Sequence, residues 1–451
     1  MKSVFSLVVI SFLVASSVWA QQPITLTLDS AVQIALDRNY TVLVNKNSID
    51  RDEAAEEAAF GNFLPTLSFG GGFSRSQSWR SNAGQYQLIN GIPVYTGGTS
   101  FQAFNSYTAG LQAGVTFFNG FAHESGLTEA KQTTESATQT YTWTKQSTIF
   151  QTHSMFLAVV ADAELVKVYQ DNLARDQKQL EEIEESMKVG ASAISDVYKQ
   201  RATVENDQYT LINEQNIFET AKANLLSYLG VDLSQTYQID FTGIPTDIDT
   251  TEFEQINKQY SDSPSLVNQA MAVRPDYLSS IAALNSAEEG VSVAKAAYYP
   301  TVSGSAEYGY NDPTLSGITN SKSLSLGLTV ALPIFNGFQT QTGVQQAEVA
   351  RDNAEEALKQ NERQVNVDIR KALLDLGTAE KEITSSKIGV VSADMDRQIA
   401  EEKYHLGSAT LLDLVTAQAE YTLAMENKVN AVNAFLLAKK ELELAQGNIS
   451  K

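Results

Sequence analysis

The chain has 451 residues, a formal net charge of −21 at pH 7 and no cysteine. The lack of cysteine excludes disulfides, thiol chemistry and an acylated cysteine after a leader. The acidic balance argues against nucleic acid as a partner, because a phosphate-binding surface needs a basic face. Packing and assembly must therefore provide the stability of this protein.

Residues 1–20 have the composition of a signal peptide. Lys2 supplies the charged start, an apolar stretch runs from Val4 to Val14, and the sequence before Gln21 fits cleavage after Ala20. We therefore expect an exported protein. No other run approaches the roughly 18–20 uninterrupted apolar residues of a membrane helix, so we expect any membrane crossing to use strands.

Three short patterns occur twice, which indicates an internal repeat. Two of them recur 217 residues later. The third recurs after 235 residues, so that an insertion of 18 residues lies between the proline and the Phe-Asn-Gly of the first copy. The pairs are Phe118-Asn119-Gly120-Phe121 with Phe335-Asn336-Gly337-Phe338, Gly190 and Asp196 with Gly407 and Asp413, and Leu64-Pro65-Thr66 with Tyr299-Pro300-Thr301.

Each copy is expected to contain a helix, a strand hairpin, a very long helix, a turn and a return helix. Pro65 and Pro300 end the first helices, because a proline nitrogen cannot donate and the preceding residue avoids helical angles. In chain order the expected segments are a signal peptide (1–20), the first helix of repeat 1 (21–63, with Asp29 as N-cap), its membrane strand hairpin (64–119), its periplasmic long helix and return helix (120–230), an equatorial belt (231–262), the first helix of repeat 2 (263–299), its membrane strand hairpin (300–336), its long helix and return helix (337–447), and a C-terminal end (448–451).

After each proline the apolar period changes from that of a helix to two. From Tyr107 to Phe117, apolar residues alternate with small polar ones, and the same holds from Leu324 to Leu332. Alternating segments of about ten residues are typical of strands between lipid and a wet lumen, although a half-buried sheet on a soluble core would give the same pattern. Four strands cannot close a barrel, and an open edge in lipid leaves backbone groups unpaired. We therefore expect three copies to form one twelve-stranded barrel.

The two long helices, 121–188 and 338–405, have about 67 residues each, which corresponds to about 100 Å. The return helices, about 192–229 and 410–446, are half as long. Together with the first helices they come close to the length of the long helices. We therefore expect coaxial stacking, with two antiparallel columns from each copy and a tunnel of twelve helices in a trimer.

Taken together, the sequence resembles the TolC-like outer-membrane efflux protein family, the outer-membrane channels of tripartite efflux or type I secretion systems. The resemblance covers essentially the whole mature chain and depends on the order and spacing of several motifs. These are the opening Leu26-Thr27-Leu28-Asp29-Ser30-Ala31-Val32-Gln33-Ile34-Ala35-Leu36, Leu64-Pro65, Arg274-Pro275-Asp276, the duplicated Phe-Asn-Gly and the duplicated Gly-x5-Asp.

The resemblance implies a homotrimer in the cell outer membrane that extends into the periplasm, with a twelve-stranded barrel continuous with a twelve-helix barrel. It also implies docking onto a periplasmic adaptor protein and an inner-membrane RND-type pump or ABC exporter, whose substrates would leave through the channel. The turns Val189-Gly190-Ala191 and Leu406-Gly407-Ser408 would then form the periplasmic tip and meet the adaptor. The alternative is that both glycines only end helices.

Members of the family narrow the closed tip with tyrosine, arginine and aspartate side chains. Carried over by position, the residues that match are Tyr404, Asp196 and Asp413. Three copies of Asp413 around a pore would favour cations over anions, whereas both acids are also suited to the first turn of a helix. Ala409 stands where familiar members have arginine, and Thr416 stands where some have a second aspartate, so the closed state is expected to have fewer ionic links.

No pattern indicates an enzyme, a cofactor or a metal. His123, His153 and His405 lack metal-ligand spacing and are expected to be solvated surface residues. No serine lies in a Gly-x-Ser-x-Gly turn. The energy for transport must therefore come from a partner.

Three other classes remain to be compared with the efflux channel. A passive porin would have strands at close intervals, and a coiled-coil surface protein would have one long heptad array. The duplicated strand pairs, separated by long helices, favour the channel. A soluble helical scaffold would need the alternating segments to be ordinary sheet. The insertion around Tyr86 to Thr99 forms either a plug or a larger outer loop, and its glycine and proline content favours an exposed loop.

Overall fold

The computed structural model describes residues 24–82, 84–95, 97–251, 253 and 263–449, so the expected signal peptide and most of residues 252–262 lie outside the described residues. The chain divides into two compact units. Unit 1 contains Met1–Leu43, Lys145–Leu266 and Asp368–Lys451, and unit 2 contains Val44–Thr144 and Val267–Val367.

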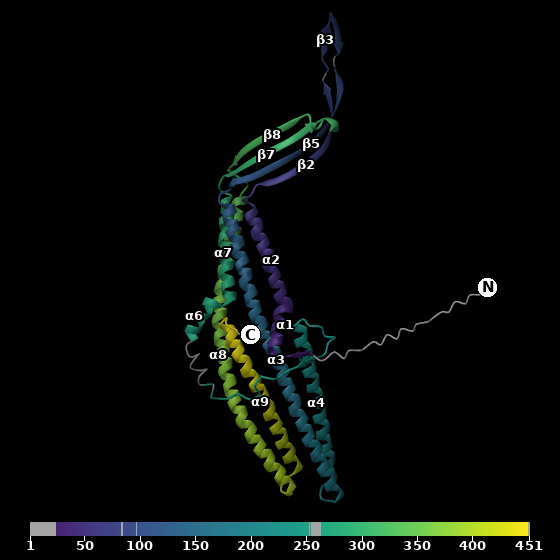
Figure 1. Ribbon diagram of the computed structural model, residues 1–451, viewed down its shortest axis with the longest axis vertical. Coiled ribbons are helices and arrows are strands. Elements are labelled where there is room, and N and C mark those ends of the chain that lie inside the picture. Colours follow the sequence, from purple (N-terminus) through teal and green to yellow (C-terminus); the bar gives the residue numbers. More distant parts are fainter. Residues whose placement is uncertain (1–23, 83, 96, 252, 254–262, 450–451) are drawn as a thin grey trace, which may run out of the picture. The chain divides into compact units, whose positions relative to one another are not determined.

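Unit 2 contains a four-stranded antiparallel sheet with the strand order β2-β5-β7-β8 (Figure 1). The strands are β2 (Thr66–Asn82), β5 (Gly98–Phe118), β7 (Thr301–Asp312) and β8 (Lys322–Ala331), with the short helix η1 (Leu315–Gly317) between the last two. The two hairpins are joined through β5 and β7, which places β2 and β8 at the two edges. This four-stranded sheet therefore has two open edges among the described residues.

Each strand hairpin leads into a long helix through the same Phe-Asn-Gly-Phe turn. In the second copy Gly337 and Phe338 have φ of +67° and +68°, and the rings of Phe335 and Phe338 meet edge to face at 5.5 Å. In the first copy Gly120 and Phe121 have φ of +70° and +69°, and the equivalent ring pair lies at 5.3 Å. A left-handed phenylalanine costs about 1–2 kcal/mol, so the ring contact offsets part of a real strain.

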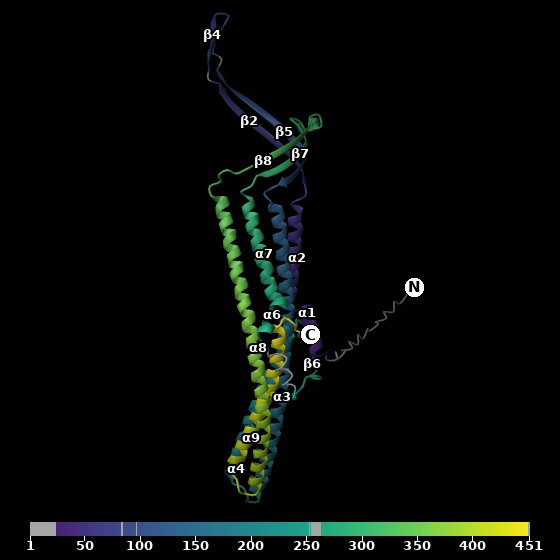
Figure 2. The same ribbon diagram turned by 90° about the vertical axis from the view of Figure 1, so that its left-hand side faces the viewer.

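The helices of unit 2 run side by side and enter the sheet at one end (Figure 2). They are α2 (Tyr40–Gly61), α7 (Pro275–Ala296), the start of α3 (Ala122–Lys188) and the start of α8 (Gln339–His405). Small hydroxyl side chains connect α3 to α7. The hydroxyl oxygens of Ser136 and Thr140 lie 3.0 and 2.8 Å from the hydroxyl oxygen of Ser279. Such small residues permit close approach of neighbouring helices.

Arg274 explains the Arg-Pro-Asp motif at the start of α7. Its side chain is 1% exposed. The guanidinium donates to both carboxylate oxygens of Asp276, at 3.0 and 2.7 Å, and lies 4.8 Å from the centre of the Trp143 ring. A buried charge needs this pairing to avoid a large desolvation penalty. The motif therefore ties α7 to α3 in unit 2.

Unit 1 has its main apolar core where β1 and α1, the first elements that the structure describes, meet α3 and α4 (Ile194–Tyr228). β1 (Ile24–Leu26) pairs in parallel with β6 (Tyr237–Ile239), and α1 (Leu28–Arg38) follows directly. The fully buried Leu26, Ala31, Phe156 and Leu225 contribute to this core.

Two antiparallel helix pairs form the rest of unit 1 (Figure 1). The first pair is α3 with α4, and the second is α8 with α9 (Leu411–Ala445). α3 and α8 have 67 residues each, and α4 and α9 have 35 each. A helix of 67 residues is about 100 Å long.

The two first helices are each broken, which corrects the expectation of single helices over 21–63 and 263–299. Asn39 separates α1 from α2 with ψ of 131°, and its side chain accepts from Thr41 N and donates to Tyr228 O, both at 2.9 Å. Arg274 separates α6 (Ser263–Val273) from α7, because it precedes Pro275 and adopts ψ of 119°. The N-cap of α1 is Thr27, not Asp29.

The insertion in the first copy is a β-hairpin, which corrects the expectation of a loop. β3 (Tyr86–Ile89) pairs with β4 (Ile92–Tyr95). Asn90 and Gly91 between them have φ of +54° and +83°, as the Asn-Gly type I′ turn requires.

One stretch within α3 is long and apolar enough to cross a membrane by length and composition alone, and 44% of its residues are buried inside the protein. The sequence analysis did not anticipate such a stretch. Its threonine and histidine residues interrupt the apolar run, and Phe156, Val159 and Val160 pack in the core of unit 1. This stretch is accordingly a core segment of unit 1.

Candidate functional site

The two turns that join the helix pairs of unit 1 share one backbone geometry. At the end of α3, Gly190 has φ of +78° and donates to Met187 O at 3.0 Å, while Ala191 N donates to Ser186 O at 2.9 Å. This is the Schellman arrangement, which satisfies the last carbonyls of a helix and needs a left-handed residue.

The end of α8 repeats this arrangement. Gly407 has φ of +71° and donates to Tyr404 O at 2.9 Å, and Ser408 N donates to Lys403 O at 2.8 Å. Both glycines therefore end helices, which is the alternative that the sequence left open beside a docking role. Capping a helix does not exclude a docking role. The space beside both glycines is open, since a Cβ added at either one would meet no atom within 4 Å.

Both turns expose an apolar side chain to solvent. Val189 is 81% exposed and Leu406 is 80% exposed, immediately before Gly190 and Gly407. Exposed apolar residues at the same position of two turns form a pair of surfaces suited to a partner protein. The neighbouring Ala191 and the next turn's Ser408 are also exposed, so the residues predicted to form the tips are accessible.

Asp413 takes part in the capping box of α9. Its carboxylate accepts from Thr410 N at 2.8 Å and from the Thr410 hydroxyl at 2.7 Å, and Asp413 N donates to Thr410 Oγ1 at 3.3 Å. These hydrogen bonds lower the pKa of Asp413, and Lys199 and Lys403 act in the same direction. Asp413 is therefore an exposed, ionised carboxylate whose position is fixed by its own helix.

Tyr404 is half-buried among the side chains that close the ends of both helix pairs. It packs against the cluster of Ile183, Val197 and Leu411, which come from α3, α4 and α9. Burial raises the pKa of the Tyr404 hydroxyl, the nearby charge of Asp196 raises it further, and a hydrogen bond with Ser192 lowers it. The hydroxyl is therefore protonated at neutral pH and faces α4.

The structure thus brings together two of the three residues predicted for the constriction. Tyr404 of α8 hydrogen-bonds with Ser192, and the charge of Asp196 on α4 is near enough to raise the pKa of Tyr404, whereas the hydrogen bonds of Asp413 go to its own N-cap. At the positions where the family pattern has arginine and a second aspartate, Ala409 N donates to Lys403 O and the Thr416 hydroxyl donates to Leu412 O.

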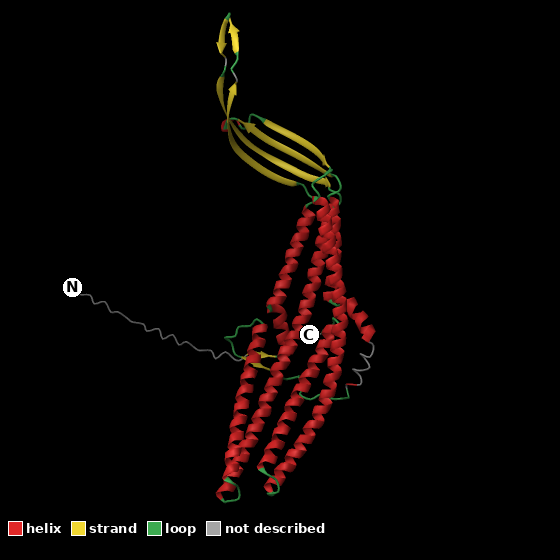
Figure 3. Ribbon diagram, turned by 180° about the vertical axis from the view of Figure 1, so that it is seen from behind, coloured by secondary structure: helices red, strands yellow, loops and turns green. Residues whose placement is uncertain are grey.

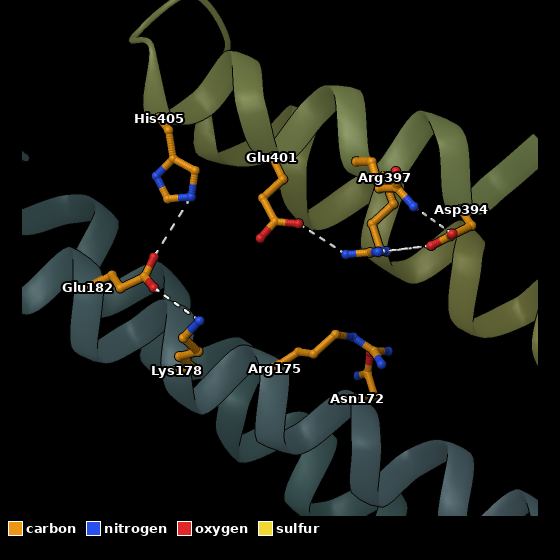
Figure 4. Close-up of polar contacts among 9 residues, drawn as sticks. Asn172, Arg175, Lys178, Glu182, Asp394, Arg397, Glu401 and His405 are labelled. Carbon is orange, nitrogen blue, oxygen red and sulfur yellow. Dashed lines mark hydrogen bonds and ion pairs between the residues drawn. The ribbon is translucent and has the colours of Figure 1, made fainter.

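A stack of two arginines on one tyrosine joins the helix pairs, which sequence reasoning missed. The guanidinium carbons of Arg175 on α3 and Arg397 on α8 lie 5.4 and 5.2 Å from the centre of the Tyr421 ring on α9. Arg397 also donates to Asp394 at 2.8 Å and to Glu401 at 3.0 Å (Figure 4). The two acids offset the charge repulsion between the arginines, so that both cation–π contacts with the ring are stable.

Further polar contacts between α3 and the second helix pair lie on either side of this stack. The Thr422 hydroxyl donates to Asn172 Oδ1 at 2.7 Å in a buried position, and Arg175 donates to the same oxygen at 3.1 Å. Closer to the turns, His405 Nε2 lies 3.9 Å from Glu182 Oε2 (Figure 4). Any separation of the two helix pairs must break these contacts.

The first helix pair also contains a buried pair of carboxyl groups. Asp176 is 2% exposed and accepts from Gln200 Nε2 at 3.0 Å. Burial raises the pKa of Asp207 to about 7, with contributions from a hydrogen bond to Asp176 and from its charge, while Arg175 and Asn172 lower it. The two carboxyl groups line a cavity of about 560 Å³ between α3, α4 and α9.

Among the residues that the structure describes, no group of three His, Asp or Glu side chains could hold a metal ion. His123 is half-buried and His405 is exposed. His153 is buried at 4% exposure, and its Nδ1–H donates to Ile149 O at 2.9 Å. The expectation of a solvated residue was therefore wrong for His153, because a histidine on the inner face of a core helix can satisfy its ring nitrogen with a backbone carbonyl.

Known proteins share this arrangement of helices and strands. The solved structure of the CmeC outer membrane channel of Campylobacter jejuni superposes with a TM-score of 0.78 at 20% identity, covering 93% of this chain and 85% of that one. The fold is thus that of an outer-membrane channel.

The sequence comparisons identify the family. The family model described as "Outer membrane efflux protein" matches residues 31–231 and 266–448. The outer membrane protein TolC of Escherichia coli is 22% identical over 422 residues, which is 90% of this chain and 80% of the relative. The pyoverdine export outer membrane protein OpmQ of Pseudomonas putida is 24% identical over 426 residues, covering 93% and 85%. The chain belongs to the outer membrane efflux protein family, and it is the outer-membrane channel of an efflux system.

Proposed function

We propose that three copies of this chain form one conduit, with a twelve-stranded barrel in the outer membrane and a twelve-helix tunnel in the periplasm. The two open edges of the sheet support this assembly, because β2 of one copy can pair with β8 of the next. Unpaired edges are not tolerated in lipid. The exported chain would lose its signal peptide after Ala20.

The side chains of the sheet support its place in the membrane. On β8, Leu324, Leu326, Leu328 and Val330 are all between 65% and 76% exposed and share one face. The residues between them are serine, glycine and threonine. An apolar outer face and a small polar inner face are typical of a strand between lipid and water.

The helix lengths support a tandem repeat with two columns from each copy. The equal lengths of α3 and α8, and of α4 and α9, are those expected of a duplicated unit. We propose that α2 stacks coaxially on α4, and α7 on α9, to complete two columns beside the long helices. Three copies then provide the walls of a tapering tunnel.

The turns Val189-Gly190-Ala191 and Leu406-Gly407-Ser408 are the proposed docking site of a periplasmic adaptor protein. The exposed Val189 and Leu406 supply the apolar contact. Through the adaptor, an inner-membrane RND-type pump or ABC exporter would deliver substrates and supply the energy for transport. The channel itself would perform no chemistry and need no cofactor.

The proposed constriction consists of Asp413, Asp196 and Tyr404. The packing of Tyr404 against Val197 of α4, together with the arginine stack on Tyr421, holds the two helix pairs close and supports a closed resting state. Asp413 would supply the charge, because it is exposed and ionised. Opening would require α8 and α9 to move away from α3 and α4.

The observation that carries the proposal is the four-stranded sheet with two open edges and an apolar face. Electron microscopy of the detergent-extracted protein tests it. The expected particle has threefold symmetry and a hollow stalk of about 100 Å. The variant Leu326→Pro removes a backbone donor from the edge strand β8 and should prevent the trimer, whereas Leu326→Val should preserve it. A monomeric or unsymmetrical wild-type particle would contradict the proposal.

A further inference from the structure

The cavity between α3, α4 and α9 in unit 1 is long and narrow. Its lining residues run from Lys199 to Thr210 on α4 and from Val415 to Glu426 on α9. Each stretch rises by eleven residues, which is about 16 Å. Spread over that length, the volume of about 560 Å³ gives a mean cross-section of about 35 Å². The helices are uninterrupted along these stretches (Figure 3), so the cavity fits a linear molecule.

Two acceptor atoms in the middle of this cavity lack a donor. Gln418 is 6% exposed and lines the cavity, and its Oε1 accepts no hydrogen bond from any residue that the structure describes. Asp207 Oδ2 is also buried and without a partner among the described residues. Burying an acceptor without a donor is unfavourable. Both atoms are therefore suited to a ligand that donates hydrogen bonds.

A second acceptor lies nearer the other end of the cavity. The half-buried Glu426 follows Gln418 by eight residues on α9, which is about 12 Å. Burial raises the pKa of the Tyr169 hydroxyl, and a hydrogen bond with Glu426 raises it further. Tyr169 also lines the cavity. A ligand that satisfies both levels must therefore have donors about 12 Å apart.

The charges that line the cavity favour a cation. Asp176, Asp207 and Glu426 are acidic, and Lys199 is the one basic side chain among the described residues that line it. Lys199 is exposed at the end nearest the turns, where its charge acts on Asp413. The middle and the far end of the cavity therefore carry an excess of negative charge.

Arg175 lies beside the cavity and does not neutralise this charge. It lowers the pKa of Asp207, but burial and the neighbouring Asp176 outweigh this effect and raise the pKa to about 7. The guanidinium of Arg175 donates to Asn172 Oδ1 at 3.1 Å and lies 5.4 Å from the centre of the Tyr421 ring. A cation within about 4–6 Å of a carboxyl group stabilises its ionised form, so a bound cation would relieve the unfavourable state of Asp207.

We propose that this cavity binds a linear polyamine, with one terminal ammonium group donating to Asp207 and Gln418 and the other donating to Glu426. A triamine such as spermidine matches the span, whereas putrescine reaches about half of it. The site lies within one chain and does not depend on the proposed trimer. Because Asp207 is on α4 and Glu426 is on α9, the ligand joins the two helix pairs and would hold the proposed gate closed. This last consequence rests on the proposed function.

Calorimetric titration of the purified protein with spermidine tests the site. It is performed at pH 8, above the pKa of Asp207, and at physiological salt, which screens surface charges. We expect one spermidine per chain. Putrescine and n-butylamine cannot reach both ends and should bind at least tenfold more weakly, and equimolar Mg²⁺ should not displace spermidine. No binding, equal affinity for n-butylamine, or displacement by Mg²⁺ would overturn the proposal.

Variants at both ends of the cavity locate the binding. Asp207→Asn and Glu426→Gln each remove one charged acceptor and should weaken spermidine binding at least tenfold. Gln418→Glu adds a carboxylate at the acceptor that lacks a donor and should tighten binding, a gain that loss of folding cannot imitate. Glu205→Gln, at an exposed acid of α4, is the control and should change nothing. Equal affinity in all four variants would place the binding on surface acids and refute the site.

Single-channel conductance in bilayers tests the effect on the proposed gate. Spermidine should lower the conductance of the wild type and of Asp413→Asn, and should have at least tenfold less effect on Glu426→Gln. If only Asp413→Asn abolishes the effect, spermidine acts at the pore and the link between the helix pairs is refuted. Binding in the cavity without any change in conductance also refutes that link and leaves the site standing. A protein that binds spermidine but forms no channel contradicts the proposed function and not the site.

Discussion

The two helix pairs of unit 1 have the same lengths and the same turn geometry, but different residues fill the space between their helices. In the first pair, Asp176, Gln200 and Asp207 form a buried polar network. The positions 217 residues later are Ala393, Ala417 and Ala424.

A polar network requires a fixed arrangement, because each buried group needs its partner. Alanines make no such demand and permit sliding of one helix on another. We therefore propose that the first pair is the fixed side of the proposed gate and that the second pair is the side that moves.

The largest expected effect comes from the turn of the second pair. Gly407→Pro removes the hydrogen bond to Tyr404 O and cannot adopt the φ of +71°, at a cost of about 3 kcal/mol. We expect export to be abolished while the trimer persists, as measured by accumulation of an effluxed dye in cells and by native gel. Normal export would refute the docking role of this turn. Gly190→Pro in the equivalent turn is the matched variant. Its effect on export shows whether the first turn also docks.

The next effect concerns the contact that joins the two pairs. Tyr421→Leu removes the ring between Arg175 and Arg397 and leaves two cations close together, which should lower the free energy of unfolding by about 1–2 kcal/mol. Because the pairs then separate more easily, single-channel conductance in bilayers should rise. Tyr421→Phe retains the ring and serves as the control. If Tyr421→Leu has the conductance of the wild type, the arginine stack does not keep the channel closed.

Two variants of Asp413 separate its role in the helix cap from the effect of its charge. Asp413→Ala removes the capping box and the charge, and should cost about 1 kcal/mol of stability and weaken the preference for cations. Asp413→Asn keeps a side-chain acceptor for the Thr410 hydroxyl and should lose only the cation preference. Reversal potentials in a salt gradient measure the selectivity, and thermal unfolding measures the cap. Unchanged selectivity in both variants would remove Asp413 from the pore.

The smallest effect is the pH dependence of the first pair. The pKa of Asp207 is raised to about 7 in the folded protein, so the folded state holds a proton that the unfolded state has lost above about pH 4. This contribution to stability is complete below the unfolded pKa and disappears as pH rises through about 7.

Thermal unfolding of wild type and Asp207→Asn checks this dependence. The wild type should lose stability relative to the variant between pH 5 and pH 8, and the effect is reduced because Asp207 is partly exposed. Glu205→Gln, an exposed acid on the same helix, should show no such trend. A constant difference between wild type and Asp207→Asn over this range would exclude the raised pKa of Asp207.

Much of the local structure follows from nearest-neighbour chemistry. The alternation from Tyr107 to Phe117 predicted a strand that the structure has as β5, and the long helical periods predicted α3 and α8. The capping box of Thr410 and Asp413 is readable as Thr-x-x-Asp before an apolar run, a signal that could have found its hydrogen bonds in advance. The break at Arg274 was likewise implied by Pro275, although it was missed.

The break at Asn39 could not be predicted from the local sequence, because the Asn39 side chain donates to Tyr228 O, 189 residues away in sequence. Nothing local to Arg175, Arg397 or Tyr421 indicates that their side chains stack. Local sequence by itself determined the periods, the caps and the glycines of the turns, since these depend on backbone angles and hydrogen bonds within a few residues. Only the tertiary structure decided that Tyr404 packs against Val197 and Leu411, that two arginines contact one tyrosine ring and that two carboxyl groups line one cavity. Each of these contacts joins helices whose relative placement is set by packing.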